Sequence, residues 1–88
     1  MATPVVVRAL ASAHIRAIDQ WWHEFRPAAP GLFGQELANA LELLSAVPNA
    51  AHEYSHPTVG GLRRALLRTT RYHVYYCVRD DVVIVPAV

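Results

Sequence analysis

The spacing of apolar side chains divides the chain into a strand, two helices and three further strands. Thr3–Leu10 contains three consecutive valines, which favour a strand. The apolar residues then recur every three or four positions, which predicts a helix that Ser12 caps and that ends before Pro27. A second stripe with this spacing predicts another helix between Pro30 and Pro48. The two stripes consist of Ala11, Ile15, Ile18, Trp22 and Phe25, and of Phe33, Leu37, Ala40, Leu41, Leu44 and Val47.

The C-terminal half alternates apolar and polar residues after an irregular segment, Asn49–Gly61. This alternation is typical of strands. The expected strands are Leu62–Thr69, Arg71–Arg79 and Val82–Val88, with turns at Thr69-Thr70 and Asp80-Asp81. Such short turns join antiparallel neighbours. The sequence therefore predicts an α+β fold, in which a helical hairpin packs on a small, mainly antiparallel sheet in the order β-α-α-β-β-β.

Length and composition exclude several classes of protein. The chain has 88 residues, which predicts a single domain over residues 1–88 with one small core. At 53% hydrophobic residues it is too apolar for intrinsic disorder, yet no apolar run approaches a membrane span. One cysteine cannot form an internal disulfide, and the N-terminus lacks the pattern of a signal peptide. We therefore expect a cytoplasmic protein without contact to a membrane.

Charge is distributed unevenly although the net charge is only +1. All basic residues are arginines, and four of the eight lie within Arg63–Arg71, beside no acidic residue. The arginine side chain donates in a fixed fork to carboxylate or phosphate groups. The cluster therefore indicates either an acidic partner or a solvated face of the sheet.

The expected strand Arg71–Arg79 separates two sets of side chains. Tyr72, Val74, Tyr76 and Val78 point to one face, whereas His73, Tyr75, Cys77 and Arg79 point to the other. The candidate functional surface consists of Arg63, Arg64, Arg68, Arg71, His73 and Tyr75. Trp21 joins it as a candidate interface residue, because adjacent Trp21 and Trp22 cannot both face the core and Trp22 fits the core stripe.

One metal motif occurs in the irregular segment. His52-Glu53-Tyr54-Ser55-His56 matches the H-E-x-x-H pattern of zinc proteases. That chemistry needs both histidines on one helical face and a third ligand further on. Pro57 follows at once and no helix is expected here, so we expect no metal site and no cofactor.

A resemblance to a known family covers nearly the whole chain, in the same order along the sequence. The residues that carry it are Trp21-Trp22, Arg26–Pro30, Leu32-Phe33, Glu36-Leu37, Ala40-Leu41, Leu44 with Pro48, Arg63–Arg68, Arg71–Tyr76 and Val82–Val88. Together they resemble the toxins of the RelE/ParE superfamily, above all the ParE-type toxins of type II toxin–antitoxin systems, often described as plasmid stabilisation proteins. The family's fold has the element order that the periodicity predicts.

This resemblance implies partners and one of two targets. The expected partner is a cognate antitoxin, which is itself the DNA-binding half, so that the toxin contacts DNA only indirectly. ParE-like members inhibit DNA gyrase by protein–protein contact, whereas RelE-like members cut mRNA in the ribosomal A site. A third possibility is a non-toxic relic that binds only the antitoxin. We expect the target or the antitoxin to contact Trp21, Arg63, Arg64, Arg68, Arg71, His73 and Tyr75.

The two branches differ in the residues that cleavage of RNA needs. The RelE-like pattern places basic residues on its second strand, and here Arg64 fills one such position while Leu66 fills the next. His73 stands where the third strand of that pattern has an arginine, and the 88 residues hold no counterpart of its C-terminal arginine and tyrosine. Arg64 and His73 would be the catalytic residues of a ribonuclease. The residue pattern of Arg71–Tyr76 resembles ParE-type toxins more closely than RelE-type toxins, so the sequence favours a gyrase inhibitor.

Overall fold

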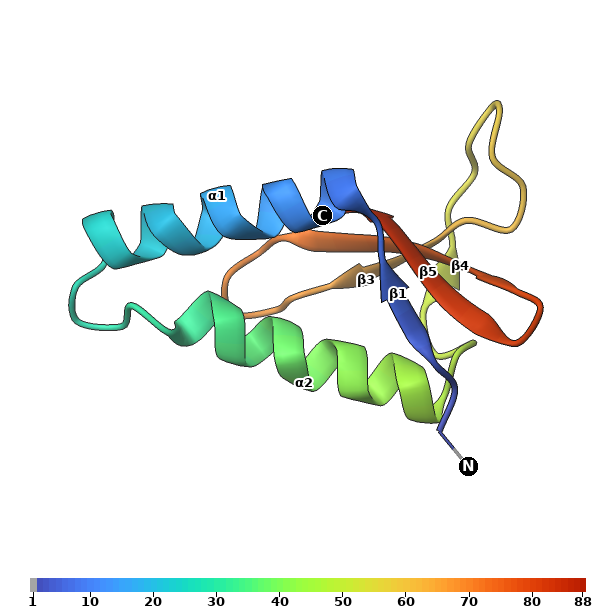
Figure 1. The fold of residues 1–88 in the computed structure, drawn as a ribbon, viewed down its shortest axis with the longest axis horizontal. Coiled ribbons are helices and arrows are strands. Elements are labelled where there is room, and N and C mark those ends of the chain that lie inside the picture. The colour runs from blue at the N-terminus through green and yellow to red at the C-terminus, as the bar shows by residue number, and fades with distance from the viewer. Residues whose placement is uncertain (1) are drawn as a thin grey trace.

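The computed structural model describes residues 2–88, which form two helices and one five-stranded sheet (Figure 1). The helices are α1 (Ala9–Phe25) and α2 (Leu32–Ala46). The strands are β1 (Val5–Val7), β2 (His52–Glu53), β3 (Arg63–Leu66), β4 (His73–Arg79) and β5 (Val82–Ala87). Their order across the sheet is β1-β5-β4-β3-β2, and only β1 runs parallel to its neighbour. The predicted fold class, a helical hairpin on a mainly antiparallel sheet, is confirmed.

The segment predicted to be irregular contributes a short strand. In β2, His52 pairs with Arg64 and Glu53 with Arg63, so this pair of residues forms an edge of the sheet. Two further bonds fix the segment: the Arg63 guanidinium donates to the Ala51 carbonyl at 2.6 Å, and the Tyr54 N–H donates to Leu62 at 2.8 Å. Strand β2 was not predicted because its two residues are too few to show a period.

The first strand is shorter than predicted and the first helix begins earlier. Pairing with β5 stops at Val7, after which the Arg8 N–H still donates to the Val85 carbonyl. Helix α1 then starts at Ala9, and the expected cap at Ser12 is wrong: the Ser12 N–H already donates to the Arg8 carbonyl inside the first turn. The parallel pairing, rather than a side-chain cap, sets this boundary.

The connection between β3 and β4 is longer than the two-residue turn predicted at Thr69-Thr70. Strand β3 ends at Leu66, and the Arg71 N–H donates to the Leu67 carbonyl while Arg71 itself has a positive φ of 71°. The predicted turn at Asp80-Asp81 is confirmed, since both residues have the positive φ angles that two-residue hairpin turns need.

An irregular register accommodates Pro86 inside the sheet. Strand β5 lies between β1 and β4, where a proline would interrupt the ladder because it has no N–H. Tyr75 pairs with Ala87 but Cys77 pairs with Ile84, so β5 has one more residue than β4 between these two pairs. This bulge contains Pro86, so the missing N–H falls where the regular ladder is already interrupted.

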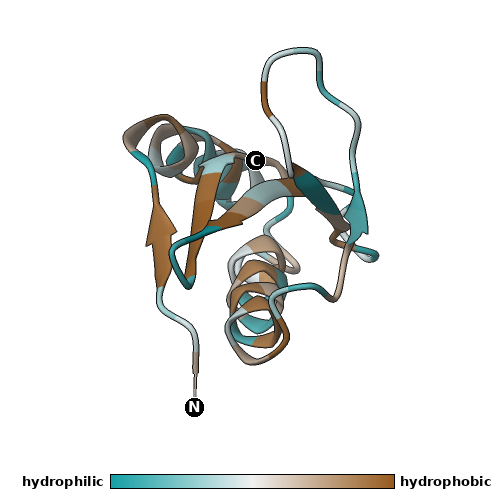
Figure 2. Ribbon diagram, turned by 90° about the vertical axis from the view of Figure 1, so that its right-hand side faces the viewer, coloured by the Kyte–Doolittle hydropathy of each residue, from teal (hydrophilic) through white to brown (hydrophobic). Residues whose placement is uncertain are grey.

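The core lies between the helices and one face of the sheet. It consists of Ala11, Phe33, Leu37, Leu44, Leu67, Val74, Tyr76, Val83 and Val85. Figure 2 shows hydrophobic residues concentrated on β1 and β5, whereas hydrophilic residues gather toward the β2 end of the sheet. The predicted stripe of α2 is confirmed from Phe33 to Leu44, but Val47 lies just after the helix and is 50% exposed. Phe25 at the end of α1 is 53% exposed as well. Within residues 2–88, neither helix is long and apolar enough to cross a membrane.

Candidate functional site

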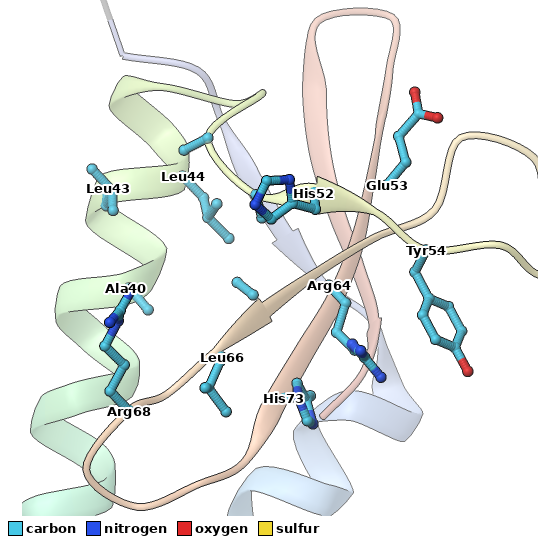
Figure 3. Close-up of a pocket in the computed structure, with 13 residues that line it drawn as sticks. Ala40, Leu43, Leu44, His52, Glu53, Tyr54, Arg64, Leu66, Arg68 and His73 are labelled. Carbon is cyan, nitrogen blue, oxygen red and sulfur yellow. The ribbon is translucent and has the colours of Figure 1, made fainter.

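A groove of about 500 Å³ lies between α2 and the strands β2 and β3 (Figure 3). One wall is apolar and comes from α2 and β3, with Ala40, Leu43, Leu44, Ala65 and Leu66. The other side carries the basic residues His52, Arg64 and His73, together with Glu53 and Tyr54, while Arg68 lies beside α2. The groove therefore combines an apolar wall with several hydrogen-bond donors.

Strand register brings the basic residues to one face of the sheet. Arg64 on β3 pairs with His52 on β2 and with Tyr75 on β4, and the next outward position pairs Leu66 with His73. Side chains of directly opposed residues lie about 4.5–5.5 Å apart at their Cβ atoms. Two strands thus bring Arg64 together with His73 and Tyr75. The alternation along the sequence predicted the shared face of His73 and Tyr75.

The Tyr54 ring packs on the Arg64 guanidinium and is itself packed against a second aromatic ring. Its Cζ lies 4.7 Å from the centroid of the Tyr54 ring, and the Tyr54 and Tyr75 rings meet edge to face at 5.5 Å. The His73 and Tyr75 ring centroids are 6.3 Å apart. A cation–π contact at such an exposed position stabilises by about 0.5–1 kcal/mol. The Tyr54 ring therefore restricts Arg64 and leaves the guanidinium N–H groups available to a ligand.

Arg63 has a different environment from its neighbour Arg64. Its guanidinium donates to the Ala51 carbonyl and lies 3.8 Å from the Glu53 carboxylate. These contacts hold β2 against β3, and Arg63 does not line the groove. Among the candidate residues, Arg63 is thus the one whose guanidinium is held by contacts between β2 and β3.

The remaining candidates lie at the margin of the groove or outside it. Arg68 lines the groove on the α2 side, whereas Arg71 is exposed on the β3–β4 connection and does not line it. Trp21 belongs to a separate aromatic cluster on α1, where it contacts Phe25 at 5.5 Å and lies under Arg26 at 5.0 Å. Trp21 is 40% exposed. Of the seven predicted residues, Arg64, Arg68 and His73 thus line the groove, and the other four, Tyr75 among them, do not.

Several residues that line the groove were not predicted as site residues. His52 and Tyr54 lie in the segment that was predicted to be irregular, and Leu43 falls outside the core stripe of α2. The only signal was indirect, because Leu43 is a large apolar residue on the polar side of a helix. Its exposure of 56% confirms that it faces away from the core.

The H-E-x-x-H pattern does not form the helix that a zinc protease needs. His52 and Glu53 are consecutive strand residues, so their side chains point to opposite faces. The His56 Nδ1 accepts the Thr58 and Val59 N–H groups at 3.2 and 3.1 Å, which fixes the loop after β2. Across the described part of the chain, no three potential metal-ligating side chains gather at one place.

Glu36 on α2 holds the connection that carries Arg68. Its Oε2 accepts the Thr69 N–H at 2.7 Å, and its Oε1 accepts the Thr70 N–H and hydroxyl at 2.9 and 2.6 Å. Partial burial raises the pKa of Glu36, but the hydrogen bonds from Thr70 and Thr69 outweigh it and hold the pKa below its usual 4.5. Glu36 is thus a stable anion that fixes one end of the groove.

In comparisons with known proteins, no protein-family model matches the chain and no curated protein matches it significantly. Chemically, the groove suits an anionic ligand, because arginine forks and histidine N–H groups donate to carboxylate or phosphate oxygens. Leu66 lies among these donors and adds an apolar contact.

Proposed function

We propose that this protein is the toxin of a type II toxin–antitoxin system, ParE-like, which inhibits DNA gyrase by protein–protein contact. A cognate antitoxin would neutralise it, and contact with DNA would be indirect, through that antitoxin. The element order and the resemblance of Arg71–Tyr76 and its flanking segments support the assignment to this class of toxins.

One observation favours protein contact over cleavage of RNA. Leu66 is 41% exposed and pairs with His73 on the outward face, directly beside Arg64. A site that cuts RNA needs several cations converging on one phosphate, and the leucine occupies a strand position where such a cation would stand. Tyrosine, arginine and exposed apolar residues are instead the composition of a protein interface.

Expression of the chain in bacteria and an assay with purified gyrase test this proposal. We expect growth arrest and inhibited supercoiling, both weakened by Arg64→Glu. Arg16→Glu on the exposed side of α1 makes the same change in charge and is the matched control, which should retain both effects. Growth arrest with fully active gyrase would refute the gyrase target, and absence of arrest would favour a relic that binds only the antitoxin.

RNA cleavage is the second candidate, because Arg64 and His73 line the same groove together with Arg68 and His52. An arginine would hold the phosphate, and a histidine titrates near neutral pH and can move the proton of a 2′-hydroxyl. Ribosome-dependent cleavage of mRNA by the wild type, abolished in His73→Gln, would establish this function. Intact mRNA in the presence of growth arrest would exclude it.

A further inference from the structure

One edge of the sheet is a strand with a free side. Within residues 2–88, β1 has β5 on one side and no strand on the other, and Figure 2 shows it at the margin of the sheet, just after the N-terminus. The Pro4 carbonyl accepts a hydrogen bond from β5 at 2.9 Å, and the Arg8 N–H donates to β5 at 3.0 Å. Backbone groups of successive strand residues point to alternating sides, so Pro4, Val6 and Arg8 bond toward β5. Val5 and Val7 therefore direct their N–H and C=O groups outward.

These outward groups contrast with those of the preceding outward residue, Thr3. Helix α2 satisfies Thr3, because the Thr3 N–H donates to the Ser45 carbonyl at 2.8 Å and the Thr3 carbonyl accepts the Ser45 hydroxyl at 2.6 Å. In the described part of the chain, no comparable bond reaches the outward side of Val5 or Val7. Two donors and two acceptors thus stand in a row at this edge, and such a row is a template for another strand.

The usual protections of an exposed edge are missing between residues 2 and 10. Proteins block such edges with charged side chains, with bulges or with a proline whose missing N–H faces outward. Pro4 is turned toward β5, so it does not interrupt the outer side. The Val6 side chain is apolar and 44% exposed, and Arg8 carries the one charge of this segment. The edge is therefore open and apolar.

We propose that β1 pairs antiparallel with β1 of a second copy of this chain, around a two-fold axis at Val6. Val5 of each copy would lie opposite Val7 of the other, and each of these two pairs exchanges two backbone hydrogen bonds. The two Val6 residues would form a non-hydrogen-bonded pair, whose Cα atoms lie about 4.5 Å apart. The two sheets would continue as one. This inference goes beyond the proposed toxin function and does not depend on it.

The arrangement suits two identical chains in charge and in closure. The two Arg8 residues would be four strand positions apart, about 13 Å, which exceeds the distance over which salt screens exposed charges. Leu10, directly after the strand, is 61% exposed and adds apolar surface near the ladder. A two-fold contact uses the same edge in both copies, so assembly stops at the dimer. A ladder of three residues buries less than a standard interface, so we expect a dissociation constant between about 1 μM and 1 mM.

Sedimentation velocity of the full chain, from about 1 μM to about 1 mM, tests the inference. We expect a monomer at the lowest concentration, a dimer at the highest and no larger species. Val6→Lys places two ammonium groups opposite each other on the axis and should weaken dimerisation at least about tenfold. Val59→Lys makes the same change at an exposed position of the β2–β3 loop and should dimerise like the wild type. Circular dichroism checks that both variants keep the fold.

Covalent trapping then locates the contact. Cys77→Ser removes the one native cysteine, and Val6→Cys in that background should form a disulfide-linked dimer under mild oxidation. The expected Cα separation lies in the range that a disulfide spans. Val59→Cys in the same background is the control and should stay monomeric.

Five results would each overturn the inference. These are a monomer at every concentration, dimerisation of Val6→Lys as strong as that of the wild type, an equal loss in Val59→Lys, assemblies that grow beyond the dimer, and equal trapping of the two cysteine variants. The last result would place any self-association on another surface of the protein.

Discussion

Thr70 donates to the same oxygen of Glu36 twice, through its backbone N–H at 2.9 Å and through its hydroxyl at 2.6 Å. The two residues belong to the β3–β4 connection and to α2, and Thr70 is buried beneath its neighbours. One carboxylate thus joins the sheet to the helix layer at the point where Arg68 enters the groove.

Replacing Glu36 with glutamine should therefore destabilise the fold. The amide keeps the size of the side chain but loses the charge and one acceptor, so that one N–H or hydroxyl of the connection loses its partner. We expect the free energy of unfolding to fall by about 1–2 kcal/mol, the range for a hydrogen bond to a charged group at a partly exposed site. Urea denaturation measures it. Glu42→Gln, at an exposed position of the same helix, is the control and should change stability by less than about 0.5 kcal/mol.

The same carboxylate makes stability depend on pH with a definite sign. The pKa of Glu36 is lowered in the folded chain, so the unfolded chain binds more protons in acid. The stabilisation is fully present above the ordinary pKa of 4.5 and disappears as the pH falls through the lowered pKa of the folded state. Denaturation of the wild type and Glu36→Gln at pH values across this range should show that the difference in their free energies of unfolding becomes smaller in acid. A difference that stays constant with pH would contradict this.

Phe33 should be among the residues on which the core depends most. Its side chain is fully buried and meets the Tyr72 ring edge to face at 5.1 Å. We expect Phe33→Ala to lower the free energy of unfolding by about 3–5 kcal/mol, because it leaves a cavity under the hairpin. Phe25→Ala makes the same chemical change at an exposed ring and should cost less than about 1 kcal/mol. Thermal and urea unfolding measure the loss of stability in both variants. Equal losses in Phe33→Ala and Phe25→Ala would contradict the place of Phe33 in the core.

The loop between β2 and β3 contains two adjacent glycines that should differ in their tolerance of a side chain. Gly61 has a φ of +70°, and a Cβ there would lie 3.2 Å from Arg79 Nη1, whereas a Cβ on Gly60 would meet nothing within 4 Å. Gly61→Ala should cost about 1 kcal/mol, mainly through the left-handed backbone. Gly60→Ala should be neutral or slightly stabilising, since it restricts the unfolded chain. Chemical denaturation of the two variants measures these changes in stability. A larger loss of stability in Gly60→Ala than in Gly61→Ala would refute the left-handed backbone at Gly61.

Sequence patterns predicted the parts of the fold in which long elements bury one face. The α2 stripe is an example: Phe33, Leu37 and Leu44 are buried as its period requires. The pattern failed for Phe25, because Figure 1 shows the end of α1 reaching past the strands, where no layer covers it. That ring packs on Trp21 instead.

The candidate site was predictable where the strand period determines it and not where loops contribute. Alternation placed His73 and Tyr75 on one face, and the register of β3 with β4 adds Arg64 to them. His52 reaches them only through the pairing of β2, a contact between segments that no local period encodes. Arg63 differs from Arg64 because it finds a carbonyl of Ala51, which depends on the course of that same segment.

The parallel pairing of β1 with β5 has a consequence for how the chain is made. Val5 pairs with Val83 and Val7 with Val85, so nearly the whole chain separates the two partners. On the ribosome, the first strand emerges early and must wait, unpaired, until the last strand has left the exit tunnel. During that interval the three valines of β1 form an exposed hydrophobic segment. Synthesis is therefore the period in which chaperones bind and proteases cleave this protein most readily.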